Sequence, residues 1–217
     1  MIWSAKQYKK GYNMKKSALN VPNTLSIIRV FLVPAFVVAL LAMRNIAIWG
    51  LVVPALIFVI TSLTDMLDGK IARKYNLVTD FGKFIDPLAD KFMVIGSQIA
   101  ILAYLFIVAD GKGDIIHGIV FMCVVLLILL RELGVTSLRL VVAGKSGIVV
   151  AASMLGKIKT VSQMIGTLVI ILEPLVFPFC ADNHIASYVM MAIMAFTTVF
   201  SGLDYLKAYL PHIDTNS

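Results

Sequence analysis

The chain has 217 residues, of which 60% are hydrophobic and 14% charged, and its formal net charge is +7. Soluble domains are usually about 45–50% apolar, so this composition, with a mean hydropathy of +0.94, excludes an ordinary soluble domain and indicates an integral membrane protein. The basic residues are spread over several short polar segments instead of one soluble face, which argues against a nucleic-acid-binding protein.

Six long apolar runs each approach the length of about 20 residues that a transmembrane helix needs. They cover about residues 24–44, 46–64, 88–109, 115–138, 150–172 and 185–206. The alternation typical of strands is absent over these runs. The sequence therefore predicts an all-α bundle of six transmembrane helices over residues 21–210, after a basic interfacial segment at 1–20 and before a tail at 211–217. Met1 and Met14 are both candidate natural starts, and no cleavable signal is expected.

The distribution of lysine and arginine among the connecting segments predicts the orientation. With a cytoplasmic N-terminus, the outer segments hold only Arg44 and Lys112, whereas the inner segments hold most of the remaining basic residues. This asymmetry follows the positive-inside rule, so both termini are predicted to be cytoplasmic. Cys123 and Cys180 are too few for a disulfide framework and are expected to be unpaired packing residues.

The first predicted span opens with a polar group of residues. Asn23 is expected to cap the helix, with Pro22 in the preceding turn. Arg29 follows within two turns. Two interpretations stay open for Arg29: a side chain that reaches the inner headgroups, or a contact to phosphate, whose oxygens match the planar guanidinium fork.

Four aspartates lie at the inner ends of the second and third predicted spans: Asp65, Asp68, Asp86 and Asp90. At 100° per residue, the i, i+3 pair lies about 60° apart and the i, i+4 pair about 40° apart, so each pair shares one helix face. Two antiparallel helices can then bring four carboxylates to one point, where their mutual repulsion requires a cation. Such oxygen ligands suit Mg²⁺ or Mn²⁺. His117, His184 and His212 have no partner at ligand spacing and receive no role.

Residues between the two aspartate pairs suit binding of a phosphorylated ligand. Gly69 and Gly82 permit close backbone approach, and Arg73 lies one turn beyond Asp68, where it can meet a phosphate held by the metal. Thr79 and Lys83 belong to the same rim.

The complete pattern D-x2-D-G-x2-A-R-x8-G-x3-D-x3-D, from Asp65 through Ala72 to Asp90, resembles the signature of the CDP-alcohol phosphatidyltransferase family. Within this family the chain most resembles the bacterial enzymes that make phosphatidylglycerophosphate. The segments that carry this resemblance are Val21 to Ser26 with Arg29, Thr79 to Lys91, Arg131 to Arg139 and Gly156 to Thr160.

The resemblance implies a substrate, CDP-diacylglycerol, and an acceptor, sn-glycerol 3-phosphate, with phosphatidylglycerophosphate and CMP as products. It implies two Mg²⁺ or Mn²⁺ ions per site on the four aspartates, with Asp90 as general base. It also implies a homodimer in a bacterial inner membrane, with the site facing the cytoplasm. The expected CDP-diacylglycerol-binding residues are Asn23, Thr24, Ser26, Gly69, Ala72, Arg73, Thr79 and Gly82.

The phosphate of the acceptor needs cations beyond the metal ligands. The candidates are Arg139, Lys145, Arg131, Lys157, Lys159 and Arg29. Positive charge on a membrane span is costly, which favours a function, although headgroup contact and topology are the alternative explanation for each lysine. Glu132 is expected to pair with a neighbouring cation, and the last span is expected to have a packing role.

Two other functions are compatible with parts of the pattern. The same chemistry could use inositol phosphate, serine or phosphatidylglycerol as acceptor. A cation transporter could use the aspartates as an ion path, but transporters place such sites near the midplane, and these aspartates lie at one edge beside Arg73 and Lys83.

Overall fold

The computed structural model describes residues 21–74, 79–109, 111–146 and 153–209, with the helical backbone but not the side chains of residues 21–22, 66–74, 80, 83, 143, 145–146 and 180. These ranges form α1 (Val21–Ala42), α2 (Trp49–Lys74), α3 (Asp80–Val108), α4 (Lys112–Ser146), α5 (Met154–Val176), the short α6 (Pro178–Ala181) and α7 (Ile185–Tyr209). No strand occurs among the described residues, so the predicted all-α class is confirmed.

Five helices are long and apolar enough to cross a membrane. Their candidate spans are Asn23–Ala42, Phe84–Val108, Lys112–Val142, Met154–Val176 and Ile185–Tyr209. The remaining predicted span, residues 46–64, corresponds to the apolar part of α2, Trp49–Asp65. It is shorter than the other five because the first aspartate ends the apolar run. This segment is still near the lower limit of about 17 residues for a spanning helix.

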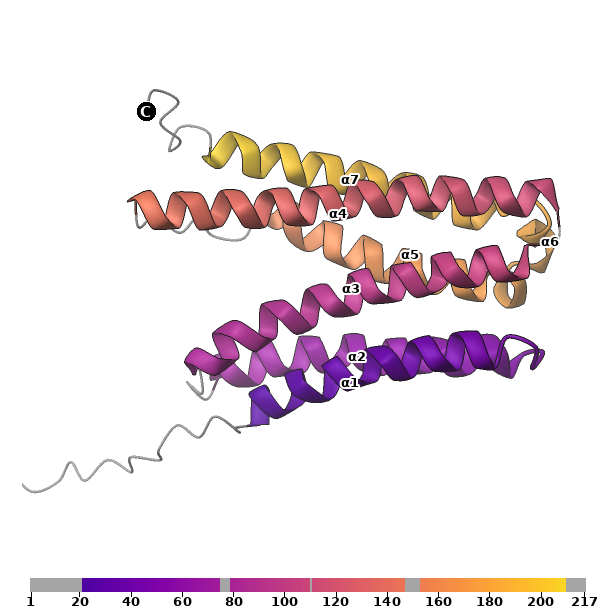
Figure 1. The fold of residues 1–217 in the computed structure, drawn as a ribbon, viewed down its shortest axis with the longest axis horizontal. Helices are drawn as coiled ribbons and strands as arrows, with labels where there is room; N and C mark the ends of the chain where they lie inside the picture. Colours follow the sequence, from indigo (N-terminus) through magenta and orange to yellow (C-terminus); the bar gives the residue numbers. More distant parts are fainter. Residues whose placement is uncertain (1–20, 75–78, 110, 147–152, 210–217) are drawn as a thin grey trace, which may run out of the picture.

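The helices run lengthwise in one elongated bundle (Figure 1). α1 packs against α2 and α3, and α7 packs against α4 and α5. The two groups are joined by contacts of α3 with α4 and α5 and of α2 with α5. The end of α2 and the start of α3 lie at one end of the bundle, at the left in Figure 1, and α6 lies at the other end. Because α3 begins at Asp80, eight residues or so before the predicted apolar span, Asp86 and Asp90 lie on one continuous helix.

The bundle has an apolar exterior and a partly polar interior. Phe31 is 71% exposed and Leu130 73% exposed, whereas Gln98, Gln163 and Thr198 are fully buried. Lipid is as apolar as leucine, so apolar side chains gain nothing from leaving the exterior. Of the buried polar side chains, Gln163 donates to Thr198 between α5 and α7, whereas the side-chain amide of Gln98 makes no hydrogen bond within the described residues. This distribution fits the multi-pass membrane protein that the composition predicts.

Candidate active site

Asp65 is held by a buried arginine from α1. The Arg29 Nη1 and Asp65 Oδ1 atoms are 2.5 Å apart, and the Arg29 side chain is only 1% exposed. Of the two interpretations left open for Arg29, contact with the headgroups is therefore wrong, because its guanidinium lies inside the bundle opposite a carboxylate. The phosphate contact stays a prediction. A charge at this depth is tolerable only when it is compensated, and Arg29 and Asp65 compensate each other.

Asp86 and Asp90 of α3 lie near Asp65 of α2. Asp65 interacts electrostatically with Asp86, and Asp90 interacts with Asp65. The Ser26 hydroxyl donates to Asp86 Oδ1 at 2.5 Å, so a second residue of α1 orients the cluster. Asp68 lies one turn further along α2, and its side chain is outside the described part of the structure. Three of the four predicted aspartates are thus brought together from two helices, as the i, i+3 and i, i+4 spacing suggests.

The start of α3 is bonded to the start of α1. Thr79 caps α3 by accepting a hydrogen bond from the Gly82 amide at 3.0 Å, and it also accepts one from the Asn23 side chain at 2.8 Å. A Cβ on Gly82 would lie 2.6 Å from Asn23 Oδ1, so only glycine allows this approach. The prediction that Asn23 caps α1 is wrong: α1 begins at Val21, and the Asn23 side chain bridges to α3 instead.

The other predicted nucleotide-binding residues are less informative. Thr24 is exposed at the same end of α1. Gly69, Ala72 and Arg73 lie on α2 beyond Asp68, but nothing of their side chains is described. Their role in binding the nucleotide stays a prediction.

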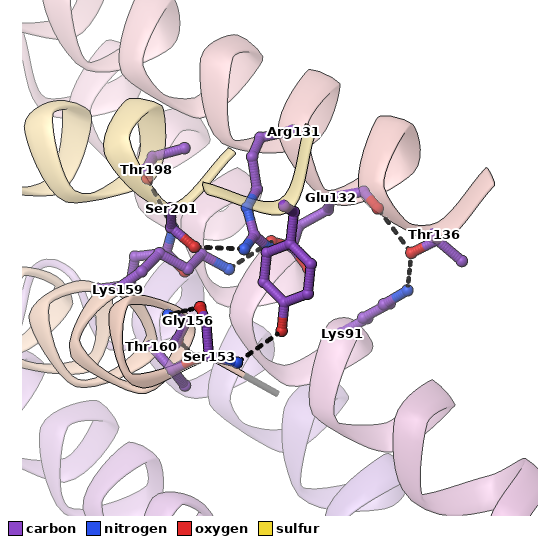
Figure 2. Close-up of polar contacts among 12 residues, drawn as sticks. Lys91, Arg131, Glu132, Thr136, Ser153, Gly156, Lys159, Thr160, Thr198 and Ser201 are labelled. Carbon is purple, nitrogen blue, oxygen red and sulfur yellow. Dashed lines mark hydrogen bonds and ion pairs between the residues drawn. The ribbon is translucent and has the colours of Figure 1, made fainter. Parts of the chain in front are cut away.

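A second polar cluster joins α4, α5 and α7, as Figure 2 shows. Glu132 forms ion pairs with both Arg131 and Lys159, so its predicted pairing with a cation is confirmed. Arg131 also donates to the Ser201 hydroxyl. Lys159 is only 5% exposed. The Glu132 carboxylate thus holds the charged groups of Arg131 and Lys159 in the bundle interior, and the three side chains together carry a net positive charge.

Tyr205 of α7 adds an aromatic face to this cluster. The guanidinium carbons of Arg131 and Arg139 lie 5.2 Å and 5.7 Å from the centre of its ring, within the range of a cation–π contact. The Tyr205 hydroxyl accepts a hydrogen bond from the Ser153 amide at 3.2 Å, which anchors the start of α5. The packing role predicted for this last span is therefore incomplete, because Tyr205 and Ser201 also contact the cationic side chains. Their i, i+4 spacing on one helix face was the available signal.

The cationic cluster lies next to the aspartates. Asp90 interacts electrostatically with Lys159 and Glu132 as well as with Asp65. The Lys91 ammonium donates to Thr136, which ties α3 to α4 at this level (Figure 2). The other predicted acceptor residues lie elsewhere: Lys157 is exposed, and Arg29 pairs with Asp65. The Lys145 side chain is outside the described residues.

The opposite end of the bundle holds a polar cluster of His117, Glu173 and His184. The rings of His117 and His184 stack with their centres 4.1 Å apart, and Glu173 lies close to both. The prediction that these histidines have no partner at ligand spacing is therefore wrong, because the pairing joins α4 to the turn before α7. The two histidines are far apart in the chain, so their spacing in the sequence does not reveal the contact.

Comparison with known proteins gives a consistent result. The family model for CDP-alcohol phosphatidyltransferase matches residues 19–200. The chain is 39% identical over 200 residues to the CDP-diacylglycerol--glycerol-3-phosphate 3-phosphatidyltransferase of Bacillus subtilis, covering 87% of this chain and 94% of that relative. It is 38% identical over 194 residues to a probable phosphatidylglycerophosphate synthase of Mycobacterium tuberculosis, covering 89% of this chain and 83% of that relative. A match of this extent shows that the chain is an enzyme of the CDP-alcohol phosphatidyltransferase family.

Proposed function

We propose that this enzyme transfers the phosphatidyl group of CDP-diacylglycerol to sn-glycerol 3-phosphate, giving phosphatidylglycerophosphate and CMP. The names of the bacterial relatives support this acceptor. The observation that carries the proposal is the buried cationic cluster beside Asp90, because an acceptor with its own phosphate needs positive charge next to the reacting hydroxyl. Serine and phosphatidylglycerol do not carry a phosphate monoester that would use this charge.

The donor set at the aspartates fits a divalent metal. Asp65, Asp86 and Asp90 offer several carboxylate oxygens at one point, and Asp68 adds another on the same helix as Asp65. Oxygen ligands of this kind suit Mg²⁺ or Mn²⁺. Bound there, two such ions would neutralise the pyrophosphate of the substrate and stabilise charge on the departing CMP. Arg29 and Ser26 keep Asp65 and Asp86 in position.

Asp90 acts as the general base in this proposal. Its carboxylate accepts the proton of the acceptor hydroxyl, and the hydroxyl oxygen forms a bond to the phosphorus of the phosphatidyl group. The bond from that phosphorus to CMP breaks, and CMP leaves with the electron pair. Asn23 and Thr79 hold the α1–α3 joint against which the nucleotide would lie, with Gly82 leaving room for close approach.

Arg131, Arg139 and Lys159 would bind the acceptor phosphate. Glu132 holds the heads of Arg131 and Lys159 so that little side-chain freedom is lost when the acceptor arrives. The Tyr205 ring limits where the two guanidinium groups can lie. Lys157, which is exposed near the start of α5, and Lys145, near the end of α4, are proposed to attract the acceptor through their charge without holding its phosphate.

We also propose a bacterial inner-membrane location with the aspartate end facing the cytoplasm, as the positive-inside distribution predicts. This places the site on the side where glycerol 3-phosphate and CMP are soluble metabolites. A homodimer, as in the family that the signature resembles, is part of the same proposal.

The direct test is CMP release by purified protein in detergent, with CDP-diacylglycerol, Mg²⁺ and one of four acceptors: glycerol 3-phosphate, inositol phosphate, serine or phosphatidylglycerol. We expect release with glycerol 3-phosphate alone, and its loss when EDTA removes the metal. Asp90→Asn should lower kcat by about 10²- to 10⁴-fold, the usual contribution of a general base. Asp182→Asn, at an exposed aspartate before α7, is the matched control and should leave the rate unchanged. Release with another acceptor would overturn the acceptor assignment.

A second variant tests the acceptor site separately. Arg131→Gln should raise KM for glycerol 3-phosphate about 10- to 100-fold, because a hydrogen bond to a charged group contributes about 1.5–3 kcal/mol, and should leave KM for CDP-diacylglycerol near its original value. Arg44→Gln, at an exposed arginine between α1 and α2, removes the same charge far from the cluster. An equal rise in both KM values for Arg131→Gln would contradict a specific acceptor role.

A further inference from the structure

The end of the bundle opposite the aspartates carries three side chains with the donor types of a transition-metal site. His117 lies in the second turn of α4, Glu173 in the last turn of α5, and His184 in the turn before α7. One ligand atom of each lies within 4.8 Å of the others. His117 and Glu173 are each only 2% exposed. Residues separated by as many as 67 positions in the chain thus meet in one shielded place.

His117 has a buried nitrogen that the described residues do not satisfy. Its Nε2 atom makes no hydrogen bond within the described part of the structure, although the ring stacks on His184 and meets the edge of Tyr188 at 5.4 Å between centres. Buried imidazole nitrogens normally have a partner, because leaving one unpaired forfeits its hydration without compensation. A metal ion would provide that partner.

The other two side chains are held by a second layer of contacts. Asp114 Oδ1 lies 2.9 Å from His184 Nε2, which leaves the remaining ring nitrogen of His184 available as a ligand. Glu173 accepts hydrogen bonds from the amides of Ala186 at 2.9 Å and Ser187 at 3.3 Å, and from the Ser187 hydroxyl. A carboxylate behind a histidine ligand is the usual arrangement at zinc sites, where it orients the ring and raises its basicity.

His184 also has an unusual backbone. Its φ angle is 51°, in the left-handed region that residues other than glycine seldom adopt. The ring of this residue stacks on the ring of His117 from α4, directly before α7 begins.

We propose that His117, Glu173 and His184 bind one transition-metal ion of the zinc class, separate from the oxygen-donor site at the aspartates and independent of the proposed reaction. Imidazole nitrogens favour Zn²⁺, Co²⁺ or Ni²⁺ over Mg²⁺. Each imidazole nitrogen directs its lone pair in the plane of the ring, and the two rings are stacked. Binding of one ion by both therefore requires the rings to rotate until their ligand nitrogens point to the same place. The ligand atoms also draw together, to the separation of about 3.3 Å that zinc–nitrogen bonds of about 2.0 Å impose in a tetrahedral site. The ion would clamp α4, α5 and α7 together.

The test uses full-length protein without a polyhistidine tag, stripped with EDTA and purified in detergent. Excess Mg²⁺ is present throughout to keep the oxygen-donor site filled. Co²⁺ is added, and its visible absorption is followed as a signature of nitrogen ligands; Zn²⁺ is then added as competitor. We expect one equivalent of Co²⁺ per chain, displacement by Zn²⁺, and a higher melting temperature with Zn²⁺ than without.

Variants assign the site to its residues. His117→Gln and His184→Asn should each abolish the Co²⁺ spectrum, and Asp114→Asn should weaken binding about 10- to 100-fold, as loss of a second-layer partner does. His212→Gln removes the remaining histidine of the chain and should change nothing. Monodisperse elution confirms that each variant is folded, and if one histidine variant is not, the other decides. Absence of stoichiometric binding in the unmodified protein, or an unchanged spectrum in a folded histidine variant, would overturn the proposal.

Discussion

At the scale of single residues, ion pairs inside an apolar bundle hold the side chains at the aspartate end in place. Arg29 is almost fully buried, and its contact with Asp65 joins α1 to α2. Neither ion would be stable alone in these surroundings, because removing one partner of a buried pair leaves an uncompensated charge. The Glu132 carboxylate has the corresponding role between Arg131 and Lys159.

This pairing predicts a non-additive effect on stability. Arg29→Gln should lower the free energy of unfolding by about 3–5 kcal/mol, because it leaves Asp65 without its cation. The double variant Arg29→Gln with Asp65→Asn should lose less than the sum of the two single variants. Reversible unfolding in detergent, followed by tryptophan fluorescence, measures these differences. Arg44→Gln, which removes an exposed arginine, serves as control, and an Arg29→Gln variant as stable as the control would show that the pair is not a structural requirement.

At the scale of helices, the joint between α1 and α3 depends on one glycine. The Thr79 hydroxyl serves both as the cap of α3 and as acceptor for Asn23, and the backbone of α3 lies close to the Asn23 side chain at Gly82. Helix packing here is set by a hydrogen-bonded contact in which no Cβ fits.

Gly82→Ala should therefore be harmful although alanine favours helices. The added Cβ would lie 2.6 Å from Asn23 Oδ1 and 3.2 Å from Thr79 Oγ1, so the joint must open. We expect a loss of stability of about 1–3 kcal/mol, typical of overpacking, and a higher KM for CDP-diacylglycerol. Both are measurable on one detergent preparation by thermal unfolding and CMP release.

Gly134→Ala is the matched control for this prediction. Gly134 lies in α4, and no atom lies within 4 Å of the Cβ that alanine would add. Helix propensity alone then applies, and the variant should be stabilised by up to about 1 kcal/mol. Equal effects of the two substitutions would show that space at Gly82 is not the deciding factor.

At the scale of the whole molecule, the bundle separates two chemically different ends. Asp65, Asp86 and Asp90 lie in the halves of α2 and α3 that are nearer the turn between these two helices, whereas His117, Glu173 and His184 lie near the short helix α6 at the other end of the bundle (Figure 1). The basic residues of the connecting segments predict that the first end is cytoplasmic.

Cysteine labelling in intact cells tests this orientation. In a background with Cys123→Ala and Cys180→Ala, Gly113→Cys places a thiol at the exposed start of α4, and Lys207→Cys places one in the exposed last turn of α7. A membrane-impermeant maleimide should label Gly113→Cys in intact spheroplasts and Lys207→Cys only after permeabilisation, because the two positions lie at opposite ends. The reverse pattern would place the aspartates outside and contradict a cytoplasmic site.

The sequence by itself determined the helical membrane class, five of the spans and the core of a sixth, and the convergence of Asp65 with Asp86 and Asp90. These properties depend on local rules: apolar length, helical periodicity, and a short hairpin that returns the chain to the same membrane edge. The family signature is also local, since its positions span only residues 65–90.

Only the tertiary structure decided which distant side chains meet. Arg29 is buried against Asp65 instead of reaching the headgroups, and Asn23 bonds to Thr79 instead of capping its own helix. Tyr205 joins the arginines of α4, and His184 joins His117, through contacts between helices far apart in the chain. Periodicity tells which face of a helix a residue occupies, but the rotation and pairing of helices depend on packing of the whole bundle, which no short stretch of sequence specifies.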